Sequence, residues 1–470
     1  MVDDYYPEQD GGERLSSEKV NCALSASMWV PKERVSNRKA LLNAAMVETQ
    51  NARTGEVGHI SLATELEDHI VLPKYFHDDW LDYLGFEYET YEHQGDRYVF
   101  TDNIKVRDEA QAKAWEAFRK AKSGVLNLAC GKGKTVMALK KIALEGYRAI
   151  VIVNNTGLLR QWRDSAQKFL GLSYDEIGIL QGTSAAKEEE WNKPLVIGMI
   201  QTLANRANSL TFDQRASFGT VIFDEVHHLS ARKFSLTAPL FLGNRYGLTA
   251  TPVREDGLEV VYYSHIGKIF YSDLKGELTA KIYFKKMPTS LALGDKIMDR
   301  TGQFSPGKLY TCLAGKTRRN MKIVNLVRRA LDKGRRILVL THSKDHPAVL
   351  AELFDTRYGD RKGIKAGVVT GSTPGESRTR IIEESRVTFA TFQVAKEGLD
   401  APSLDTIIFA TPFKAWGAFQ QGKGRVERKK SNKRDPLVVV LEDYNIGPAS
   451  GMCRSLKKNI LAHGFKYHST

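Results

Sequence analysis

Short runs of hydrophobic, largely β-branched residues recur along most of the chain, separated by longer stretches that suit helices. Continuous apolar runs of this kind are typical of strands buried on both faces, as in a parallel sheet covered by helices. The runs form two series of five, at 124–130, 148–153, 195–200, 220–224 and 245–250, and at 336–341, 364–370, 387–392, 405–410 and 437–442. The pattern therefore predicts an α/β protein with two parallel-sheet domains in tandem.

The remaining sequence divides the chain further. Residues 1–103 are acidic and rich in aromatic residues, and we interpret them as a small α+β accessory domain with a disordered tail through about Ser17. The first sheet domain is predicted for 104–284 and the second for 321–470. Between them, 285–320 is less periodic and richer in Gly, Pro and basic residues, which favours a connecting segment.

Composition excludes several classes of protein. The chain has 470 residues, of which 42% are hydrophobic and 26% charged, as in ordinary globular domains rather than disordered or fibrous chains. No run approaches the roughly 18 apolar residues of a membrane span, and the N-terminus lacks the pattern of a secretory signal. The four cysteines are far apart: Cys22, Cys130, Cys312 and Cys453. We therefore expect a cytoplasmic protein without disulfides, a zinc site or a membrane partner.

Charge is unevenly distributed along the chain. Residues 1–103 carry a net charge of −11 and residues 104–470 carry +25, which together give the total of +14. An excess of this size on the two sheet domains is enough to attract a polyanion over a broad surface. Solvated basic side chains would give the same count, so the charge alone does not identify a nucleic-acid-binding protein.

The first sequence with chemical meaning is ACGKGKT, which directly follows a predicted strand and precedes a predicted helix. Glycines at Gly131 and Gly133 allow backbone N–H groups to turn toward phosphate oxygens. Lys134 can then reach the β- and γ-phosphates, Thr135 can ligate Mg²⁺, and Lys132 lies within the same loop. The motif predicts nucleotide binding.

The second is DEVHH, at the end of another predicted strand. Asp224 suits a metal contact through water, and Glu225 suits the orientation and deprotonation of an attacking water. The neighbouring residues His227 and His228 point in different directions and have no further Cys or His at ligand spacing. We therefore do not expect zinc there.

Two more groups extend this chemistry. Thr249 and Thr251 stand at a strand end 25 residues after the acidic pair, where short hydroxyl side chains can relay hydrogen bonds. Arg425 and Arg428 are spaced to share one face of a helical turn. A guanidinium directed at a phosphoryl group stabilises charge that develops in the transition state. Because these arginines belong to the second domain, hydrolysis would require closure of the two domains.

In order along the chain, ACGKGKT, DEVHH, LTATP, EGLDAP and QQGKGRVER resemble the motifs of the DExH helicases and translocases of superfamily 2. They are especially similar to the XPB-like branch, which includes the UvsW-type recombination helicases of tailed phages. The resemblance covers about residues 104–445. It implies two RecA-like domains and, for Gln421 with Arg425 and Arg428, contacts across the interdomain cleft to the γ-phosphate.

The resemblance also implies roles that composition does not show. Gln111, with Arg107 nearby, would sense adenine. Gly398 and Asp400 would bridge ATP and nucleic acid, and His227 would join the two threonines in coupling the sites. The implied DNA contacts are Thr156, Gln161, Gln201, Thr202, His342, Ser343, Gly371 and Ser372.

The sequence thus favours ATP-dependent translocation on branched, forked or duplex DNA, with ATP and Mg²⁺ at the site. The resemblance implies 3′→5′ polarity with fork reversal or branch migration. Alternatives are a DExH RNA helicase, the motor subunit of a restriction or nuclease assembly, and a nucleotide-gated DNA-binding scaffold without hydrolysis. We expect a monomer, with a possible protein partner for the acidic N-terminal domain.

Overall fold

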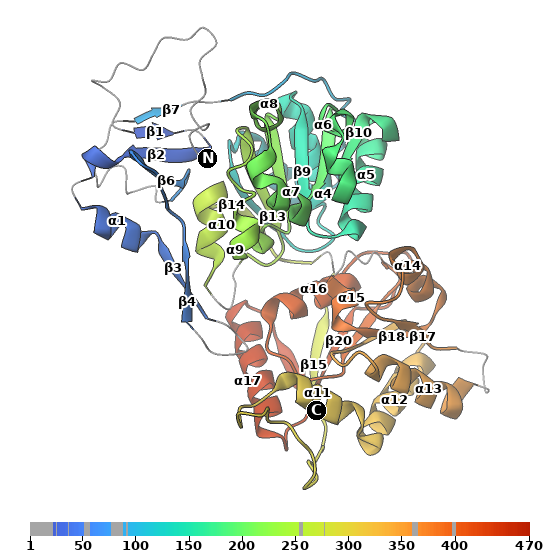
Figure 1. Cartoon of the computed structure of the whole chain (residues 1–470). Helices are drawn as coiled ribbons and strands as arrows, with labels where there is room; N and C mark the ends of the chain where they lie inside the picture. Colours follow the sequence, from blue (N-terminus) through green and yellow to red (C-terminus); the bar gives the residue numbers. More distant parts are fainter. Residues whose placement is uncertain are drawn as a thin grey trace. The chain divides into compact units, whose positions relative to one another are not determined.

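The computed structural model describes most of the chain. The described residues are 22–24, 26–35, 37–50, 57–76, 88–90, 93–252, 257–276, 278–359, 365–396 and 401–470. The disordered tail predicted through Ser17 lies outside them. The chain forms two compact units, one centred on the sheet that ends at Asp273 and one that comprises the chain from Leu274 onward together with Ala129–Lys132 (Figure 1). None of the helices in the described residues has the length and apolarity that a membrane crossing requires.

The first unit contains a sheet of seven strands in the order β10-β11-β9-β12-β13-β8-β14, all paired in parallel. Its strands are β8 (Gly124–Leu128), β9 (Ala149–Val153), β10 (Ile177–Leu180), β11 (Leu195–Met199), β12 (Thr220–Asp224), β13 (Asn244–Thr249) and β14 (Ile269–Asp273). Its helices are α3 (Glu109–Lys120), α4 (Lys134–Glu145), α5 (Thr156–Leu170), α6 (Glu188–Trp191), α7 (Ile200–Arg206), α8 (Phe212–Ala216), α9 (Arg232–Ser235) and α10 (Glu259–Ile266).

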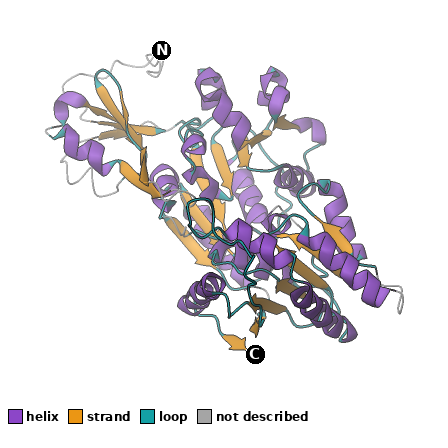
Figure 2. Cartoon of the chain, turned by 60° about the horizontal axis from the view of Figure 1, so that its bottom comes forward, coloured by secondary structure: helices purple, strands orange, loops and turns teal. Residues whose placement is uncertain are grey.

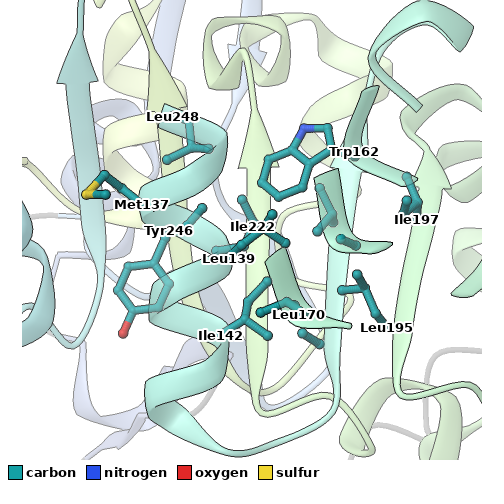
Figure 3. Close-up of a cluster of buried hydrophobic side chains, with 14 of the residues drawn as sticks. Met137, Leu139, Ile142, Trp162, Leu170, Leu195, Ile197, Ile222, Tyr246 and Leu248 are labelled. Atoms are coloured by element: carbon teal, nitrogen blue, oxygen red, sulfur yellow. The ribbon is translucent and has the colours of Figure 1, made fainter. Parts of the chain in front are cut away.

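Alternate side chains of most strands in this sheet enter two separate cores. Leu126 and Ile222 face the cluster formed with α3, α4 and α5, which Figure 3 shows in part. Val125 and Val221 face the cluster on the other side of the sheet. Burial on both faces explains the continuous apolar runs, and the five predicted strands are confirmed. The two strands that the pattern missed, β10 and β14, are the edge strands of the sheet.

The second unit repeats this architecture with a parallel sheet in the order β17-β18-β16-β19-β20-β15-β21. Its strands are β15 (Lys281–Lys286), β16 (Ile337–Thr341), β17 (Gly367–Val369), β18 (Val387–Thr391), β19 (Thr406–Phe409), β20 (Leu437–Glu442) and β21 (Tyr467–Ser469). Its helices are α11 (Pro306–Ala314), α12 (Thr317–Asp332), α13 (His346–Tyr358), α14 (Gly375–Glu384), α15 (Phe392–Lys396), α16 (Trp416–Val426) and α17 (Gly447–Ala462). Figure 2 shows helices on both sides of the strands.

The boundary between the sheet domains differs from the prediction. Residue 284 lies inside β15, which pairs with β20 and β21 of the second sheet. The segment 285–320 also belongs to the second unit, because Leu309 and Leu313 of α11 pack against residues at the start of α17. This stretch was interpreted as a connection because its helix α11 is short and its loops carry Gly and basic residues. The first domain therefore ends near Asp273.

The N-terminal region is a small α+β structure, as predicted. One sheet has the order β5-β6-β2-β1-β7, and a separate hairpin pairs β3 with β4. The strands are β1 (Cys22–Leu24), β2 (Ser27–Pro31), β3 (Met46–Gln50), β4 (Val57–Ser61), β5 (Thr64–Glu65), β6 (His69–Pro73) and β7 (Tyr88–Thr90), with helix α1 (Arg38–Ala44) between β2 and β3.

This N-terminal structure packs directly on the first sheet domain. Val261 of α10 belongs to its hydrophobic core, and the Tyr75 backbone N–H donates to the Ser264 carbonyl at 2.7 Å. The buried guanidinium of Arg245 donates to the Ala26 carbonyl. Phe100, placed in the accessory domain by the prediction, is buried in the core beneath α3 and α4. The accessory structure therefore ends before residue 103.

A buried histidine makes the stability of the second unit depend on pH. His346 at the start of α13 is fully buried, and its Nε2 lies 2.9 Å from Asn320 Oδ1. Burial, with a smaller effect of Arg319, lowers the pKa of His346 to about 3. The unfolded chain takes up this proton below its ordinary pKa of 6.5, so stability is complete above that value and falls as the pH decreases.

Between pH 7 and pH 5 we expect the wild type to lose about 2 kcal/mol more unfolding free energy than His346→Gln. Denaturant unfolding of both proteins at the two pH values measures the difference. Equal losses would show that His346 does not contribute.

Candidate nucleotide site and nucleic-acid loops

The predicted catalytic residues of the first unit lie at one edge of its sheet. In a parallel sheet all carboxyl ends lie together, and the order β11-β9-β12-β13-β8 places five of them in a row. The phosphate loop follows β8, Asp224 ends β12 and Thr249 ends β13. Asn155 follows β9 and Gln201 follows β11. Residues spread over more than seventy positions therefore share one edge.

The phosphate loop has the backbone that its sequence predicts. Gly131 and Gly133 have φ angles of 84° and 85°, which side chains with a Cβ rarely adopt. Helix α4 begins at Lys134, and the Lys134 ammonium donates to the Leu128 carbonyl at 3.1 Å. Thr135 occupies the second helical position. The start of a 12-residue helix thus presents its N–H groups and positive dipole end, which favour an anion such as a phosphate.

Gln111 lies against this loop. Its side chain is buried, and Oε1 accepts the Arg107 backbone N–H at 3.0 Å. The other end of the amide lies beside Gly133, where an added Cβ would come within 2.6 Å of Nε2. Asp108 caps α3 by accepting the Gln111 N–H at 2.9 Å and also pairs with the Arg107 guanidinium at 3.0 Å. These contacts hold the Gln111 side chain beside the phosphate loop. The Arg107 side chain instead pairs with Asp108 at the surface.

The two carboxylates of DEVHH, Asp224 and Glu225, lie in different environments. Asp224 is buried, and its carboxylate accepts the indole N–H of Trp162 at 2.7 Å and the Glu225 N–H at 3.0 Å. Burial, together with the charge of Glu225, raises the pKa of Asp224 to about 6. Glu225 has a φ of 49°, a left-handed value that residues with a side chain rarely adopt. Its Oε2 is buried without a hydrogen-bond partner among the described residues.

This donor set fits a divalent cation that shares its ligands with a nucleotide. Among the described residues no three His, Cys, Asp or Glu side chains gather as a metal cage. When a protein offers one carboxylate beside a phosphate loop, the nucleotide phosphates and water molecules supply the other ligands of the cation. Asp224 and the hydroxyl of Thr135, which the sequence predicted as ligands, are the side chains that could hold it. Among the described residues, His227 and His228 are part of no such cluster.

The three predicted coupling residues are in contact. His227 Nδ1 lies 3.3 Å from Thr249 Oγ1 and 3.5 Å from Glu225 Oε2. The same Thr249 hydroxyl accepts the Thr251 N–H at 3.0 Å. A chain of polar contacts therefore leads from Glu225 through the end of β13 to Thr251.

Trp162 is a site residue that the sequence did not identify. It directly follows Gln161, one of the implied DNA contacts, but its ring is fully buried at one end of the apolar cluster in Figure 3. Only its N–H is polar, and that group holds Asp224. A buried indole usually finds a hydrogen-bond partner, so a tryptophan on the apolar side of α5 was the available signal.

We expect Trp162→Phe to raise the divalent-cation concentration needed for half-maximal ATPase activity about tenfold, since loss of a second-sphere partner of a metal-binding residue costs about 10- to 100-fold in metal affinity. Phenylalanine is smaller than the fully buried indole, so we also expect a loss of stability of about 1 to 3 kcal/mol. Titration of Mn²⁺ binding by electron paramagnetic resonance in the presence of nucleotide measures affinity without turnover. An unchanged Mn²⁺ affinity would remove Trp162 from the site.

The remaining predicted contacts of the first unit lie near the same edge. Thr156 and Gln161 are exposed on α5, whose first turn is capped by Asn155 through the Leu158 N–H at 2.9 Å. Gln201 donates to the Asn154 carbonyl at 3.0 Å, which joins the ends of β9 and β11. The hydroxyl of Thr202 accepts the Gly182 N–H at 3.2 Å.

In the second unit, the loop after β17, which was predicted to contact DNA, is exposed and is stabilised by hydrogen bonds. Gly371 and Ser372 are exposed after β17, and Ser372 Oγ lies 2.8 Å from Thr370 Oγ1. Arg378 of α14 donates to the Gly371 carbonyl at 3.0 Å and to the Thr373 carbonyl at 2.8 Å. Arg378 was not predicted, because its partner atoms are backbone carbonyls that no sequence motif records.

His342 has a different setting from that of an exposed contact residue. Its ring stacks on Tyr310 at 4.3 Å and on Phe392 at 3.8 Å, and Nδ1 lies 2.7 Å from Thr411 Oγ1. Both ring faces are covered, so the ring cannot stack on a base. Its neighbour Ser343 is only partly buried.

The arginine motif is partly helical. Helix α16 ends at Val426, so Arg425 lies in its last turn and Arg428 lies beyond it. The expectation that both share one helical face is therefore wrong, because the helix stops between them. Gln421 Oε1 is buried without a hydrogen-bond partner in the described part of the chain. Gly398 and Asp400 lie outside the described residues.

Packing explains the rest of this helix. A Cβ on Gly422 would lie 2.6 Å from the Phe409 ring, so α16 approaches β19 too closely for a larger residue there. The ring of Trp416 stacks on that of His463, with the ring centroids 4.2 Å apart. Phe419 is fully buried. Both aromatic residues are part of the core.

Comparison with known proteins decides the family. Residues 102–254 match the family model of the type III restriction enzyme, res subunit, and residues 319–430 match that of the helicase conserved C-terminal domain. The DNA 3'-5' translocase XPB2 of Sulfurisphaera tokodaii is 30% identical over 397 residues, which cover 74% of this chain and 85% of that protein. The chain belongs to the XPB family.

Two further similarities agree with this XPB-family assignment. The probable helicase D10 of Escherichia phage T5 is 25% identical, over 77% of each chain. Among solved structures, Mycobacterium smegmatis helicase Lhr bound to ssDNA and AMP-PNP has a TM-score of 0.52 at 18% identity, covering 76% of this chain and 48% of that one. This likeness confirms the two RecA-like domains. As an XPB-family helicase the chain is an ATP-hydrolysing enzyme.

Proposed function

We propose that this XPB-family chain, an ATP-dependent DNA helicase or translocase, hydrolyses ATP at the carboxyl edge of its first sheet and uses it to move along duplex, forked or branched DNA. The observation that carries the proposal is the buried Asp224, with the half-buried Glu225 directly after it, at one sheet edge with the phosphate loop at Lys134. The relative from Sulfurisphaera tokodaii is named a 3'-5' translocase, and we propose the same polarity here.

Each residue of the edge then has one task. The N–H groups before α4 and the Lys134 ammonium bind the β- and γ-phosphates. A divalent cation, which we propose is Mg²⁺, offsets phosphate charge when it is bound. Thr135 and Asp224 would hold it, while Glu225 orients a water and accepts its proton. Gln111 lies beside Gly133 of the loop, and we propose that its amide recognises the adenine of ATP.

The second unit supplies the remaining charge. We propose that Arg425 and Arg428 stabilise the phosphoryl transition state, with Gln421 beside them, when the units close on ATP. Because those arginines act only in the closed state, hydrolysis is coupled to movement of the units. The exposed residues Thr156, Gln161, Gly371 and Ser372 would then hold the DNA backbone in alternating states.

Stimulation of the ATPase by nucleic acid tests this function. We expect forked and duplex DNA to raise turnover more than single-stranded RNA. Backbone contacts also predict that the DNA concentration for half-maximal stimulation rises steeply between 50 and 200 mM salt, since each neutralised phosphate adds about one to the logarithmic salt slope. Stimulation by RNA alone would favour an RNA helicase. DNA binding without phosphate release would favour a scaffold.

We also propose that the chain acts as a monomer and that its acidic N-terminal region, with a net charge of −11 over residues 1–103, is the surface for any protein partner. Sedimentation velocity with and without DNA tests the oligomeric state.

A further inference from the structure

The segment through which the chain enters the second unit is fastened to the arginine motif. We call residues 274–276 and 278–280 the entry segment; it follows β14 and precedes β15. The Leu278 N–H donates to the Glu427 carbonyl at 3.0 Å, and the buried Ala280 N–H donates to Glu427 Oε1 at 3.0 Å. Glu427 is the residue directly after α16 and lies in sequence between Arg425 and Arg428.

Close packing at Gly276 supports the same attachment. A Cβ on Gly276 would overlap the Glu427 carboxylate, 2.8 Å from Cδ and 2.9 Å from Cβ. Gly276 does not have a positive φ, so the glycine is required for space rather than for backbone conformation. The entry segment is therefore attached to Glu427 by two hydrogen bonds and by the close packing of Gly276.

A buried ion pair fixes the orientation of that glutamate. Lys423 Nζ lies 2.6 Å from Glu427 Oε2, and the two side chains are 2% and 4% exposed. The Lys423 ammonium also lies 4.3 Å from the Phe465 ring centroid. Both carboxylate oxygens of Glu427 are thus engaged, one by Lys423 and one by Ala280. A buried pair of this kind contributes more to a unique geometry than to stability, because apolar replacements are often neutral.

From this geometry we propose that Glu427 is a positioning residue that joins the entry segment to the arginine motif, so that displacement of the segment moves Arg425 and Arg428. The functional part rests on the proposed role of these arginines, whereas the physical attachment does not. Glu427 touches no reacting atom and acts through the motif around it.

Two matched double variants separate attachment from folding. Lys423→Met/Glu427→Gln removes both charges but keeps an acceptor for the Ala280 N–H. Lys423→Met/Glu427→Leu keeps similar volume and removes the acceptor. Hydrogen exchange at Leu278 and Ala280 should stay slow in the first and become faster in the second. This measurement does not depend on activity.

In the same proteins, we expect kcat for DNA-stimulated hydrolysis to stay within about twofold of wild type in the Gln variant. It should fall about tenfold or more in the Leu variant with little change in KM for ATP, since small misplacement of a catalytic group can cost about 100-fold. A third variant, Gly276→Ala, should resemble the Leu variant, and Gly294→Ala, where no atom lies within 4 Å of the added Cβ, is its control.

Equal exchange in the two double variants would overturn the attachment. Faster exchange without a fall in kcat, or a rise in KM alone, would overturn the positioning role. If the wild type shows no DNA-stimulated hydrolysis, the proposed function fails, and the exchange data still decide the attachment.

Discussion

Replacement of Glu225 by glutamine should lower ATP turnover by about 100- to 10,000-fold, the contribution expected of a general base, while ATP still binds. Glutamine keeps the shape of the side chain and its left-handed backbone position, but it cannot accept the proton of the attacking water. The carboxylate is suited to this role because its Oε2 is buried without a hydrogen-bond partner among the described residues.

Binding and turnover must be measured separately in this variant. A fluorescent ATP analogue should give a Kd within a few fold of wild type, while phosphate release is nearly lost in the presence of DNA. Glu189→Gln is the matched control, because Glu189 is an exposed glutamate of α6 in the same unit. Turnover near the wild-type value would remove Glu225 as the base, and a parallel loss of ATP affinity would assign it to ground-state binding instead.

The parts of the site that could be predicted are those encoded by short local sequences. The turn at Gly131 and Gly133 and the acidic pair after β12 depend on a strand end and the few residues that follow it. Their convergence also follows from sequence, since parallel strands place all carboxyl ends at one edge. The fold was predicted for a similar reason, because strands buried on both faces have continuous apolar runs.

The parts that could not be predicted depend on contacts between distant residues. The indole of Trp162 reaches Asp224 across 62 positions, and the entry segment reaches Glu427 across 147. His342 stacks on Tyr310 of α11, a helix that the sequence assigned to a connection. Edge strands such as β14 are half-buried and therefore lack a continuous apolar run. In each case the sequence fixes the residue type, but only the fold supplies the partner.

Replacement of Arg428 by alanine should lower kcat for DNA-stimulated hydrolysis at least about 100-fold, with ATP affinity changed only a few fold. A guanidinium that acts on charge developing in the transition state affects kcat rather than ground-state binding. Arg428 is a cleaner test than the buried Arg425, since it is only partly buried and lies beyond α16. Its carbonyl accepts the Lys433 ammonium at 2.7 Å, a contact that the alanine variant keeps.

Arg428→Lys should restore little of the lost activity, because an ammonium lacks the planar fork that engages two phosphate oxygens. Arg329→Ala, which removes an exposed arginine from α12 of the same unit, is the control and should hydrolyse ATP at the wild-type rate. Steady-state kinetics with saturating DNA give kcat and KM for the three variants. A residue that acts on developing charge must show its effect in kcat. The transition-state role is therefore wrong if the lysine variant recovers most of the activity, or if KM rises while kcat is kept. In either case Arg428 binds ATP in the ground state.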